Sequence, residues 1–307
     1  MIEKIKNFGK NNPDICAIIT FGSLHSCDIS DRDDFSDLDI FVFTKNPDKY
    51  LNPNDSTWIT NFGEPTSVLV LKNPFENNMI NRIMLNDYFS LDVIPISFNK
   101  FKLIKLYFIL KKLNLHRVIA NHNLIESELK TFYTYLSRGY SIIYDKKNIV
   151  DLIQKIEGTY KQDILETSIT EKEFQENYND FWQTAYKLLG TITRDELYYG
   201  ILTLDNVLKK RLIEVIEWES QIFNKHIEDT YYFGKRIKQW ANRDTLESLQ
   251  ETFFNHQNEN SYITLKKNIE LYKKISDKIS KIKNYNKNII LENQVSDKLL
   301  QYVKLTQ

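Results

Sequence analysis

The spacing of apolar residues changes near residue 150, and this change restricts the folds that the chain can adopt. Upstream of it, short apolar runs separated by turns are typical of buried strands. These runs cover residues 14–20, 38–43, 67–71 and 88–96, and a shorter one covers 141–145. Downstream, apolar residues recur every three or four positions, as in amphipathic helices. The helical segments are 177–189, 194–219, 244–254 and 262–283.

An α+β fold with two domains combines both patterns. Helical spacing also occurs among the strands, at residues 2–11, 77–84, 101–113 and 125–135. Pro95 predicts that the strand at 88–96 ends or lies at an edge there, because proline cannot donate a ladder hydrogen bond. We therefore predict a mixed sheet with helices over residues 1–150, followed by an all-α helical bundle over residues 151–307.

Composition disfavours several classes of partner. Lys+Arg and Asp+Glu both number 41 among 307 residues, so no overall positive field is available to hold nucleic acid. No apolar run approaches the roughly 18 residues of a membrane span, and the polar amino terminus lacks the apolar core of a signal peptide. The two cysteines and five scattered histidines show no metal-type spacing. We expect a cytoplasmic monomer or homodimer that binds neither nucleic acid nor membrane.

Two short motifs occupy the junction of the first two predicted strands. Gly22-Ser23 follows the first strand, where glycine lets the backbone approach a ligand and serine offers a hydroxyl and an N–H to a phosphate. Asp37 and Asp39 open the second strand, so their side chains share one face. Carboxylates this close repel each other unless a cation lies between them. Mg²⁺ suits this role, because it prefers oxygen ligands and accompanies substrate phosphates.

Asp92 adds a carboxylate from within the apolar run 88–96. An aspartate inside a buried strand is unfavourable unless it is paired or bound to metal. If its strand lies beside that of Asp37 and Asp39, the three carboxylates converge, as in two-metal phosphoryl and nucleotidyl transfer. Ordinary alternatives exist, since most Asp-x-Asp pairs are exposed acidic turns and a lone strand aspartate can be a cap or an ion-pair partner. Nearby charges that we interpret as loop solvation are Asp31, Asp33 and Asp34.

The combination of Gly-Ser, Asp-Leu-Asp-Ile and a later Leu-Asp-Val-Ile resembles the nucleotidyltransferase fold of the DNA polymerase β superfamily. Within it, the chain resembles the aminoglycoside 6-adenylyltransferases, the enzymes that modify streptomycin. The segments that carry this narrower resemblance are Trp58–Pro65, Asp180–Trp218 and Tyr232–Phe253. The chain departs from the family pattern in a longer segment at 100–135, in the absence of a glycine turn before Asp92, and at Leu24, where a basic residue is familiar.

The resemblance implies transfer of AMP from ATP to a hydroxyl of streptomycin, with release of pyrophosphate and resistance to the antibiotic. Carried over to this sequence, Gly22 and Ser23 would hold the triphosphate, and Asp37 and Asp39 would bind Mg²⁺. Asp92 would complete the metal site or act as general base on the acceptor hydroxyl. The sequence leaves both roles of Asp92 open.

A polycationic acceptor calls for an acidic pocket with some aromatic walls. The candidates for this pocket are Glu64, Trp182, Glu196, Asp205, Glu214 and Glu217. Lys187 and Arg194 are candidates for the triphosphate, because such ligands often bind in clefts between domains. Weaker candidates for the same task are Arg82, Lys146 and Arg236. For each residue alone the ordinary alternative is stronger, since helical glutamates are usually solvated and tryptophans usually belong to the core.

Two other functions share the same N-terminal residues. A nucleotidyltransferase for another small hydroxyl acceptor, such as a lincosamide, would need every residue of the phosphate and metal motifs. A catalytically silent nucleotide-binding regulatory protein is the third hypothesis. The intact Asp37, Asp39 and Asp92 argue against it, because a silent protein has no reason to bury three carboxylates together.

Overall fold

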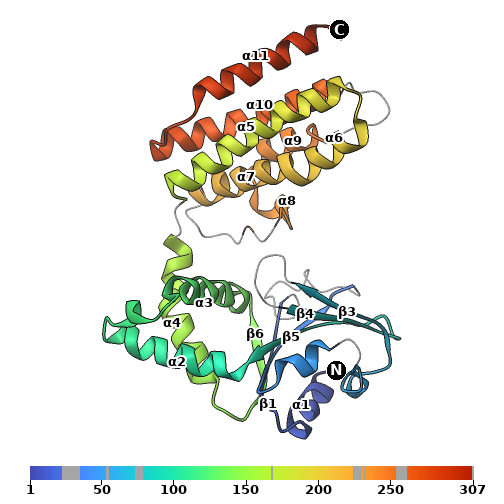
Figure 1. The fold of residues 1–307 in the computed structure, drawn as a ribbon, viewed down its shortest axis with the longest axis vertical. Coiled ribbons are helices and arrows are strands. Elements are labelled where there is room, and N and C mark those ends of the chain that lie inside the picture. Colours follow the sequence, from blue (N-terminus) through green and yellow to red (C-terminus); the bar gives the residue numbers. More distant parts are fainter. Residues whose placement is uncertain are drawn as a thin grey trace. The chain divides into compact units, whose positions relative to one another are not determined.

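The computed structural model describes residues 1–22, 35–52, 55–72, 79–166, 169–223, 230, 233–253 and 261–305. Ser23 and the three loop aspartates Asp31, Asp33 and Asp34 lie outside the described residues. The chain divides into two compact units, Met1–Ile164 and Leu165–Gln307, and each is described by itself (Figure 1). The first contains the sheet and the second is helical, which confirms the predicted α+β class.

The first unit is built on a mixed sheet with the strand order β3-β4-β5-β2-β1-β6. β2 and β5 are parallel, and the other neighbouring pairs are antiparallel. The strands are β1 (Ile15–Phe21), β2 (Leu38–Thr44), β3 (Pro65–Lys72), β4 (Met79–Leu85), β5 (Ser90–Ser97) and β6 (Tyr140–Asp145).

Side chains of β2 alternate between two apolar clusters, one on each face of the sheet. Leu38 and Ile40 pack with α1 (Ile2–Asn11) and the 3₁₀ turns η3 (Pro47–Leu51) and η4 (Ile59–Asn61). Phe41 and Phe43 pack on the other face, which α2 (Phe98–Lys112), α3 (His122–Ser137) and α4 (Val150–Glu166) cover (Figure 1). Since the side-chain period of a strand is two, Asp39 faces the α2–α4 side, where β2 begins.

The helix predicted over residues 77–84 is wrong, because residues 79–85 form β4. This strand pairs with β3 on one side and β5 on the other, and those ladders override a helix-like spacing of apolar residues. The prediction that the strand ends or lies at an edge at Pro95 is wrong, because β5 continues to Ser97 between β4 and β2. Its last pair with β4 is Asn81 with Val93, whereas Pro95 remains in register with Val42 of β2.

The boundary between the units lies one helix later than the expected position at residue 150. α4 belongs to the first unit because Leu152, Ile153, Ile156 and Tyr160 are buried in the cluster on the α2–α4 side of the sheet. The sequence change at 150 therefore marks the end of strand formation rather than the end of the first unit.

The second unit buries an apolar cluster between long helices, with Trp182, Leu212 and Tyr272 at 0% exposure. Its helices are α5 (Glu171–Thr193), α6 (Leu197–Thr203), α7 (Lys209–Phe223), α8 (Ile237–Trp240), α9 (Arg243–Gln250), α10 (Ser261–Lys283) and α11 (Ile289–Leu305). The continuous helix predicted over 194–219 is instead interrupted by Asp195, at a φ of 58°, and by the π-helical segment Leu204–Leu208. Among the described helices, none is both long and apolar enough to cross a membrane.

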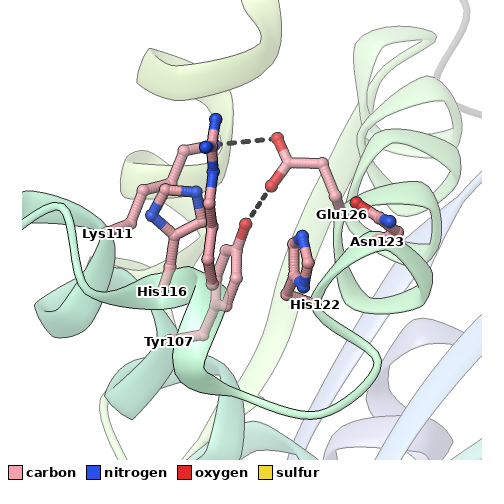
Figure 2. A pocket seen from close by; sticks show the side chains of 7 residues that line it. Tyr107, Lys111, His116, His122, Asn123 and Glu126 are labelled. Atoms are coloured by element: carbon pink, nitrogen blue, oxygen red, sulfur yellow. Dashed lines mark hydrogen bonds and ion pairs between the residues drawn. The ribbon is translucent and has the colours of Figure 1, made fainter.

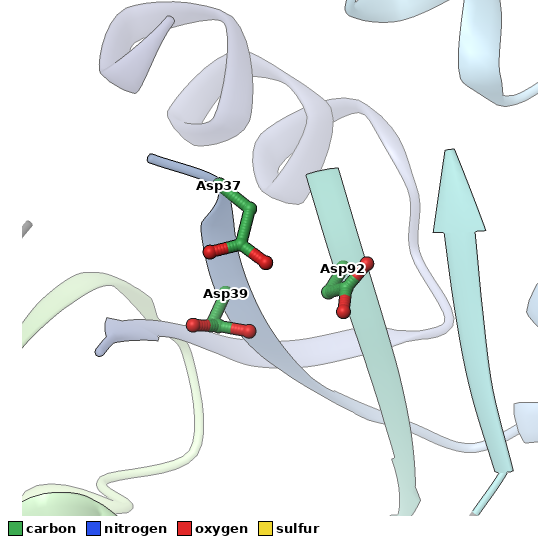
Figure 3. Close-up of side chains that lie close together, drawn as sticks. All are labelled: Asp37, Asp39 and Asp92. Atoms are coloured by element: carbon green, nitrogen blue, oxygen red, sulfur yellow. The ribbon is translucent and has the colours of Figure 1, made fainter. Parts of the chain in front are cut away.

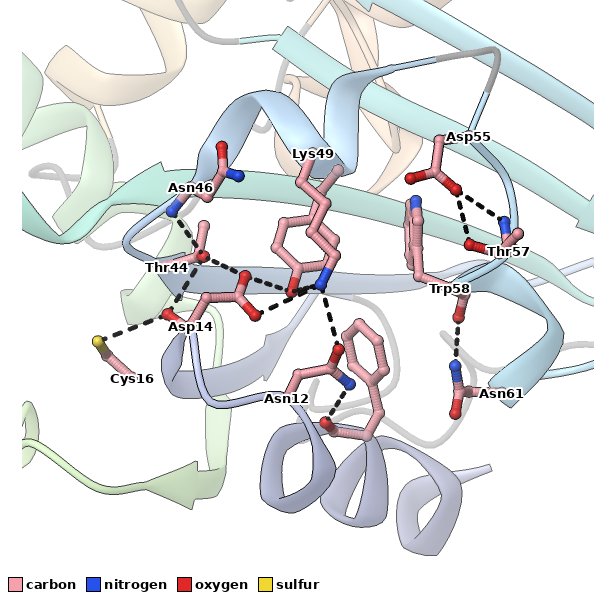
Figure 4. Close-up of polar contacts among 12 residues, drawn as sticks. Asn12, Asp14, Cys16, Thr44, Asn46, Lys49, Asp55, Thr57, Trp58 and Asn61 are labelled. Carbon is pink, nitrogen blue, oxygen red and sulfur yellow. Dashed lines mark hydrogen bonds and ion pairs between the residues drawn. The ribbon is translucent and has the colours of Figure 1, made fainter.

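Asp14 connects the start of β1 with the end of β2 and with η3 (Figure 4). Its carboxylate accepts hydrogen bonds from Tyr50 Oη at 2.7 Å and Thr44 Oγ1 at 3.1 Å, and Lys49 Nζ lies 3.4 Å away. Burial alone would raise the pKa of Asp14, but the hydrogen bonds and the lysine charge outweigh it and hold that pKa below its ordinary value. The ionised carboxylate therefore stabilises this corner of the sheet.

Asp14→Asn should lower the free energy of unfolding by about 1–2 kcal/mol at neutral pH, because hydrogen bonds to a charged acceptor are lost. The folded-state pKa lies below the ordinary 3.8, so the contribution is complete above that value and disappears as the pH falls through the folded-state pKa. Thermal denaturation at a series of pH values measures both effects. Asp48→Asn, at an exposed position nearby, is the control, and an equal loss in both variants would contradict the role given to Asp14.

Candidate active site

Three carboxylates meet where β2 and β5 begin, on the α2–α4 side of the sheet (Figure 3). The two strands are parallel neighbours, and Asp39 is in direct register with Asp92. Asp37 precedes β2 and lies two residues from Asp39, so the same face carries both. One carboxylate oxygen from each residue lies within 4.8 Å of the others. The predicted convergence of Asp37, Asp39 and Asp92 is therefore present in the structure.

Arg82 of β4 neutralises one of these charges. It stands opposite Asp92 in the β4–β5 register. Its Nε lies 3.0 and 3.2 Å from the two oxygens of Asp92, and its Nη2 lies 2.6 Å from Oδ2. The hydrogen bonds to Asp92 raise the pKa of Arg82 against the effect of burial, and the charges of Asp37 and Asp39 add to the rise. With all four groups ionised, these three carboxylates and the guanidinium sum to a net charge of −2.

The carboxylate cluster has the chemistry of a site for a hard divalent cation. Its donors are oxygens, which Mg²⁺ prefers, and its residual charge matches a divalent ion. Asp92 is 3% exposed, and a buried carboxylate needs such compensation. Each carboxylate oxygen has two lone pairs, so Asp92 can accept hydrogen bonds from Arg82 and still offer a lone pair to a metal. Within the described part of the chain, no other group of three or more His, Cys, Asp or Glu side chains has this spacing.

Gly22 lies against Asp39, at the end of β1. Phe21 pairs with Asp39 across the β1–β2 ladder, and Gly22 adopts a φ of +85° that side chains rarely tolerate. A Cβ at this position would approach Asp39 Oδ2 to 2.3 Å. Glycine is thus required here for the backbone to reach the carboxylate cluster. Ser23, the other residue predicted to grip phosphate, is outside the described residues.

Glu64 lies at the same end of the sheet as the carboxylates. It is exposed between η4 and β3. Its backbone carbonyl accepts a hydrogen bond from the amide of Asn86 at 3.0 Å, in the turn that leads to β5. The side chain remains a candidate for contact with an acceptor.

The helical-unit candidates occupy different settings, and several contact one another. Arg194, predicted for the triphosphate, forms an exposed ion pair with Glu196, predicted for the acceptor, at 3.1 Å. Asp205 of the π-helical segment pairs with Lys209, the first residue of α7, at 3.1 Å. Lys187 is exposed on α5. These positions leave the proposed roles to experiment.

Trp182 has a core position instead of the predicted place in a pocket wall. It is fully buried, and its ring packs against Tyr178, Phe181 and Tyr272. An indole without exposed surface cannot stack on an acceptor, so the ordinary interpretation of a helical tryptophan as core is the correct one.

Glu214 belongs to an acidic cluster on α5 and α7 that sequence reasoning found only in part. Its carboxylate accepts from Asn177 Nδ2 at 2.7 Å and from Arg211 Nη1 at 2.9 Å, and Arg211 also pairs with Asp180 at 2.6 Å. Glu217 lies one turn further along α7. Burial, reinforced by the charge of Glu214, raises the pKa of Glu217 to about 8. The sequence indicated Glu214 and Glu217 only as acidic residues of one predicted helix, whereas Asn177 and Asp180 required the packing of α5 on α7.

Comparisons with known proteins identify the family. A family model for streptomycin adenylyltransferase matches residues 1–303. The chain is similar to aminoglycoside 6-adenylyltransferases of Campylobacter jejuni, at 22% identity over 90% of this chain and 85% of that protein, and of Staphylococcus aureus, at 28% identity over 38% and 42%. A solved aminoglycoside 6-adenyltransferase from Bacillus subtilis aligns with a TM-score of 0.43 at 16% identity, over 98% of this chain and 96% of that one. Because the family match spans nearly the whole sequence, this chain belongs to the streptomycin adenylyltransferase family of nucleotidyltransferase enzymes.

Proposed function

We propose that this enzyme transfers AMP from ATP to a hydroxyl of an aminoglycoside, with streptomycin as the foremost acceptor, in a reaction that requires Mg²⁺ and releases pyrophosphate. The observation that carries the proposal is the convergence of Asp37, Asp39 and Asp92 within 4.8 Å at the start of two adjacent parallel strands. Family membership supports adenylyl transfer as the chemistry. Such an enzyme would use ATP in the cytoplasm and confer resistance to the modified antibiotic.

In this reaction the acceptor oxygen forms a bond to the α-phosphorus of ATP, and the bond from that phosphorus to the oxygen bridging the β-phosphorus breaks. Pyrophosphate leaves, and the hydroxyl proton passes to a base. A bound divalent cation would neutralise the charge of the phosphates and orient them. Asp37, Asp39 and Asp92 would hold this cation. The backbone at Gly22 would approach the triphosphate, and Ser23, Lys187 and Arg194 are proposed as its further ligands.

Arg82 bears on the choice between the two roles of Asp92. Both oxygens of Asp92 accept hydrogen bonds from the guanidinium, which fixes the orientation of the carboxylate and reduces its availability to take a proton. These contacts favour Asp92 as a metal ligand over Asp92 as the general base. Arg82 would then be a positioning residue, in place of the triphosphate contact first considered for it.

The acidic cluster of the helical unit supports a polycationic acceptor. Asp180, Glu214 and Glu217 carry three carboxyl groups against the single guanidinium of Arg211. Ionising a half-buried glutamate beside another carboxylate costs stability, and such perturbed groups concentrate at functional sites. A ligand with several positive charges would relieve this cost, whereas a weakly charged lincosamide would relieve less of it. Glu64, Glu196 and Asp205 are proposed as additional acceptor contacts.

Pyrophosphate release tests the proposed function directly. The purified protein, ATP and Mg²⁺ should release pyrophosphate with streptomycin, and mass spectrometry should show an adenylylated product. Asp39→Asn should lose this activity because it removes one carboxylate of the metal site, while its melting temperature stays near that of the parent. Release with a lincosamide alone would transfer the proposal to that acceptor class. No release with any aminoglycoside or lincosamide, or full activity in Asp39→Asn, would overturn it.

Glu217→Gln should raise the melting temperature of the ligand-free protein at pH 8 and leave it unchanged near pH 4.5. The folded-state pKa of about 8 lies above the ordinary 4.5, so the folded protein retains a proton that the unfolded chain releases, and stability falls as the pH rises between these values. The same substitution should weaken streptomycin binding, measured by calorimetry. Glu251→Gln, at an exposed position, is the control. A variant less stable than the parent at pH 8 would contradict the electrostatic account of this cluster.

A further inference from the structure

A polar pocket of about 410 Å³ lies in the first unit between α2, the turn η5 (His116–Val118) and α3. Figure 2 shows Tyr107, Lys111 and His116 on one side of it, facing His122, Asn123 and Glu126 of α3. Arg117 also lines the pocket. The pocket shares no residue with the carboxylate cluster. It lies in the segment 100–135, to which the proposed reaction gives no role.

The acidic group of this pocket is already engaged. Glu126 is the single acidic residue among the described residues that line it. One carboxylate oxygen accepts a hydrogen bond from Lys111 Nζ at 2.8 Å, and the other accepts one from the hydroxyl of Tyr107. Burial alone would raise the pKa of Glu126, but these bonds outweigh it and hold that pKa below its ordinary value. The carboxylate is therefore an internal anchor that fixes Lys111 and Tyr107 at the pocket wall.

The remaining groups of the pocket are donors or cations. Nδ1 of His116 is buried and has no hydrogen-bond partner, and the His116 ring lies 6.2 Å from that of His122, centre to centre. Arg117 supplies an exposed cation. The chain between Asp92 and Glu126 contains six Lys and Arg residues and no Asp or Glu, although the whole protein has zero net charge. Counted without the histidines, the charged lining residues Lys111, Arg117 and Glu126 sum to +1, which favours anions.

We propose that this pocket binds a phosphate-bearing small molecule, with its phosphate held by Lys111, His116 and Arg117. Guanidinium, ammonium and imidazole groups are the side chains that recognise phosphate by charge-assisted hydrogen bonds. The volume exceeds the space that a lone phosphate ion needs and falls in the range of pockets for small organic ligands, roughly 300–1,000 Å³. The rings of Tyr107, His116 and His122 provide walls for an organic moiety, so a sugar phosphate has suitable size and chemistry.

Glucose 6-phosphate, inorganic phosphate and glucose serve as probes, since none of them is a nucleotide or an aminoglycoside. Titrated into the full-length protein, glucose 6-phosphate should shift the imidazole NMR signals of His116 and His122 in a saturable manner, and glucose should not. Arg117→Ala and His116→Ala should each weaken binding by about tenfold, because each removes one charge-assisted contact. Lys100→Ala is the control. It removes one positive charge from α2, the helix that carries Lys111, at an exposed position outside the pocket, and it should leave the affinity unchanged.

Saturable binding of inorganic phosphate as well would support the site and assign most of the affinity to the phosphate group. Absence of a histidine shift with either phosphate would overturn the proposal. An equal loss of affinity in Lys100→Ala and Arg117→Ala would overturn it too, because it would show diffuse attraction to a basic surface instead of a defined site. Both outcomes are independent of adenylyl transfer, since Asp37, Asp39 and Asp92 are unaltered in every variant.

Discussion

Repulsion among three carboxylates at the start of two parallel strands is the constraint on which the site depends. Asp39 and Asp92 are held opposite each other by the backbone register of β2 and β5, so they cannot separate without breaking that ladder. Leu38 and Ile40 anchor β2 in the core on the α1 side, and this fixes the aspartates on the other face. Arg82 compensates one charge. The net negative charge of these four side chains would attract a divalent cation together with its bound triphosphate.

Packing against the sheet holds this end of β2 in place while it leaves Asp37 and Asp39 partly exposed beside the buried Asp92. The β2 residues Phe41 and Phe43 continue the line of Asp37 and Asp39 along one face, and they are covered by the α2–α4 layer. The apolar part of the strand thus holds the polar part in place. In the helical unit, Asn177 has a comparable role, because its amide joins the hydroxyl of Tyr272 to the carboxylate of Glu214. Both clusters consist of acidic groups held by buried neighbours.

The sequence alone predicted the parts of the site that follow from strand periodicity. Asp37, Asp39 and Asp92 could be found because an acidic residue interrupts or opens an apolar run, and their convergence needed only the adjacency of two strands. Arg82 could not be assigned to Asp92, because residues 77–84 have helix-like spacing and the ladders that make them a strand are non-local. The burial of Trp182 and the partners of Glu214 likewise depend on how helices pack. The pocket beside His116 combines α2, η5 and α3, and no local pattern predicts it.

The central claim is that Asp37, Asp39 and Asp92 form one divalent-cation site, and cation binding in the absence of nucleotide tests it most directly. Mn²⁺, which favours the same oxygen ligands as Mg²⁺, can be titrated into the protein and its free fraction followed by electron paramagnetic resonance. The account predicts one binding class in the parent that Asp37→Asn and Asp39→Asn each weaken by at least about tenfold, a loss of roughly 1.4 kcal/mol or more. Asp87→Asn, at an exposed turn position, should leave it unchanged. Equal Mn²⁺ affinity in the parent and in Asp39→Asn would contradict the claim.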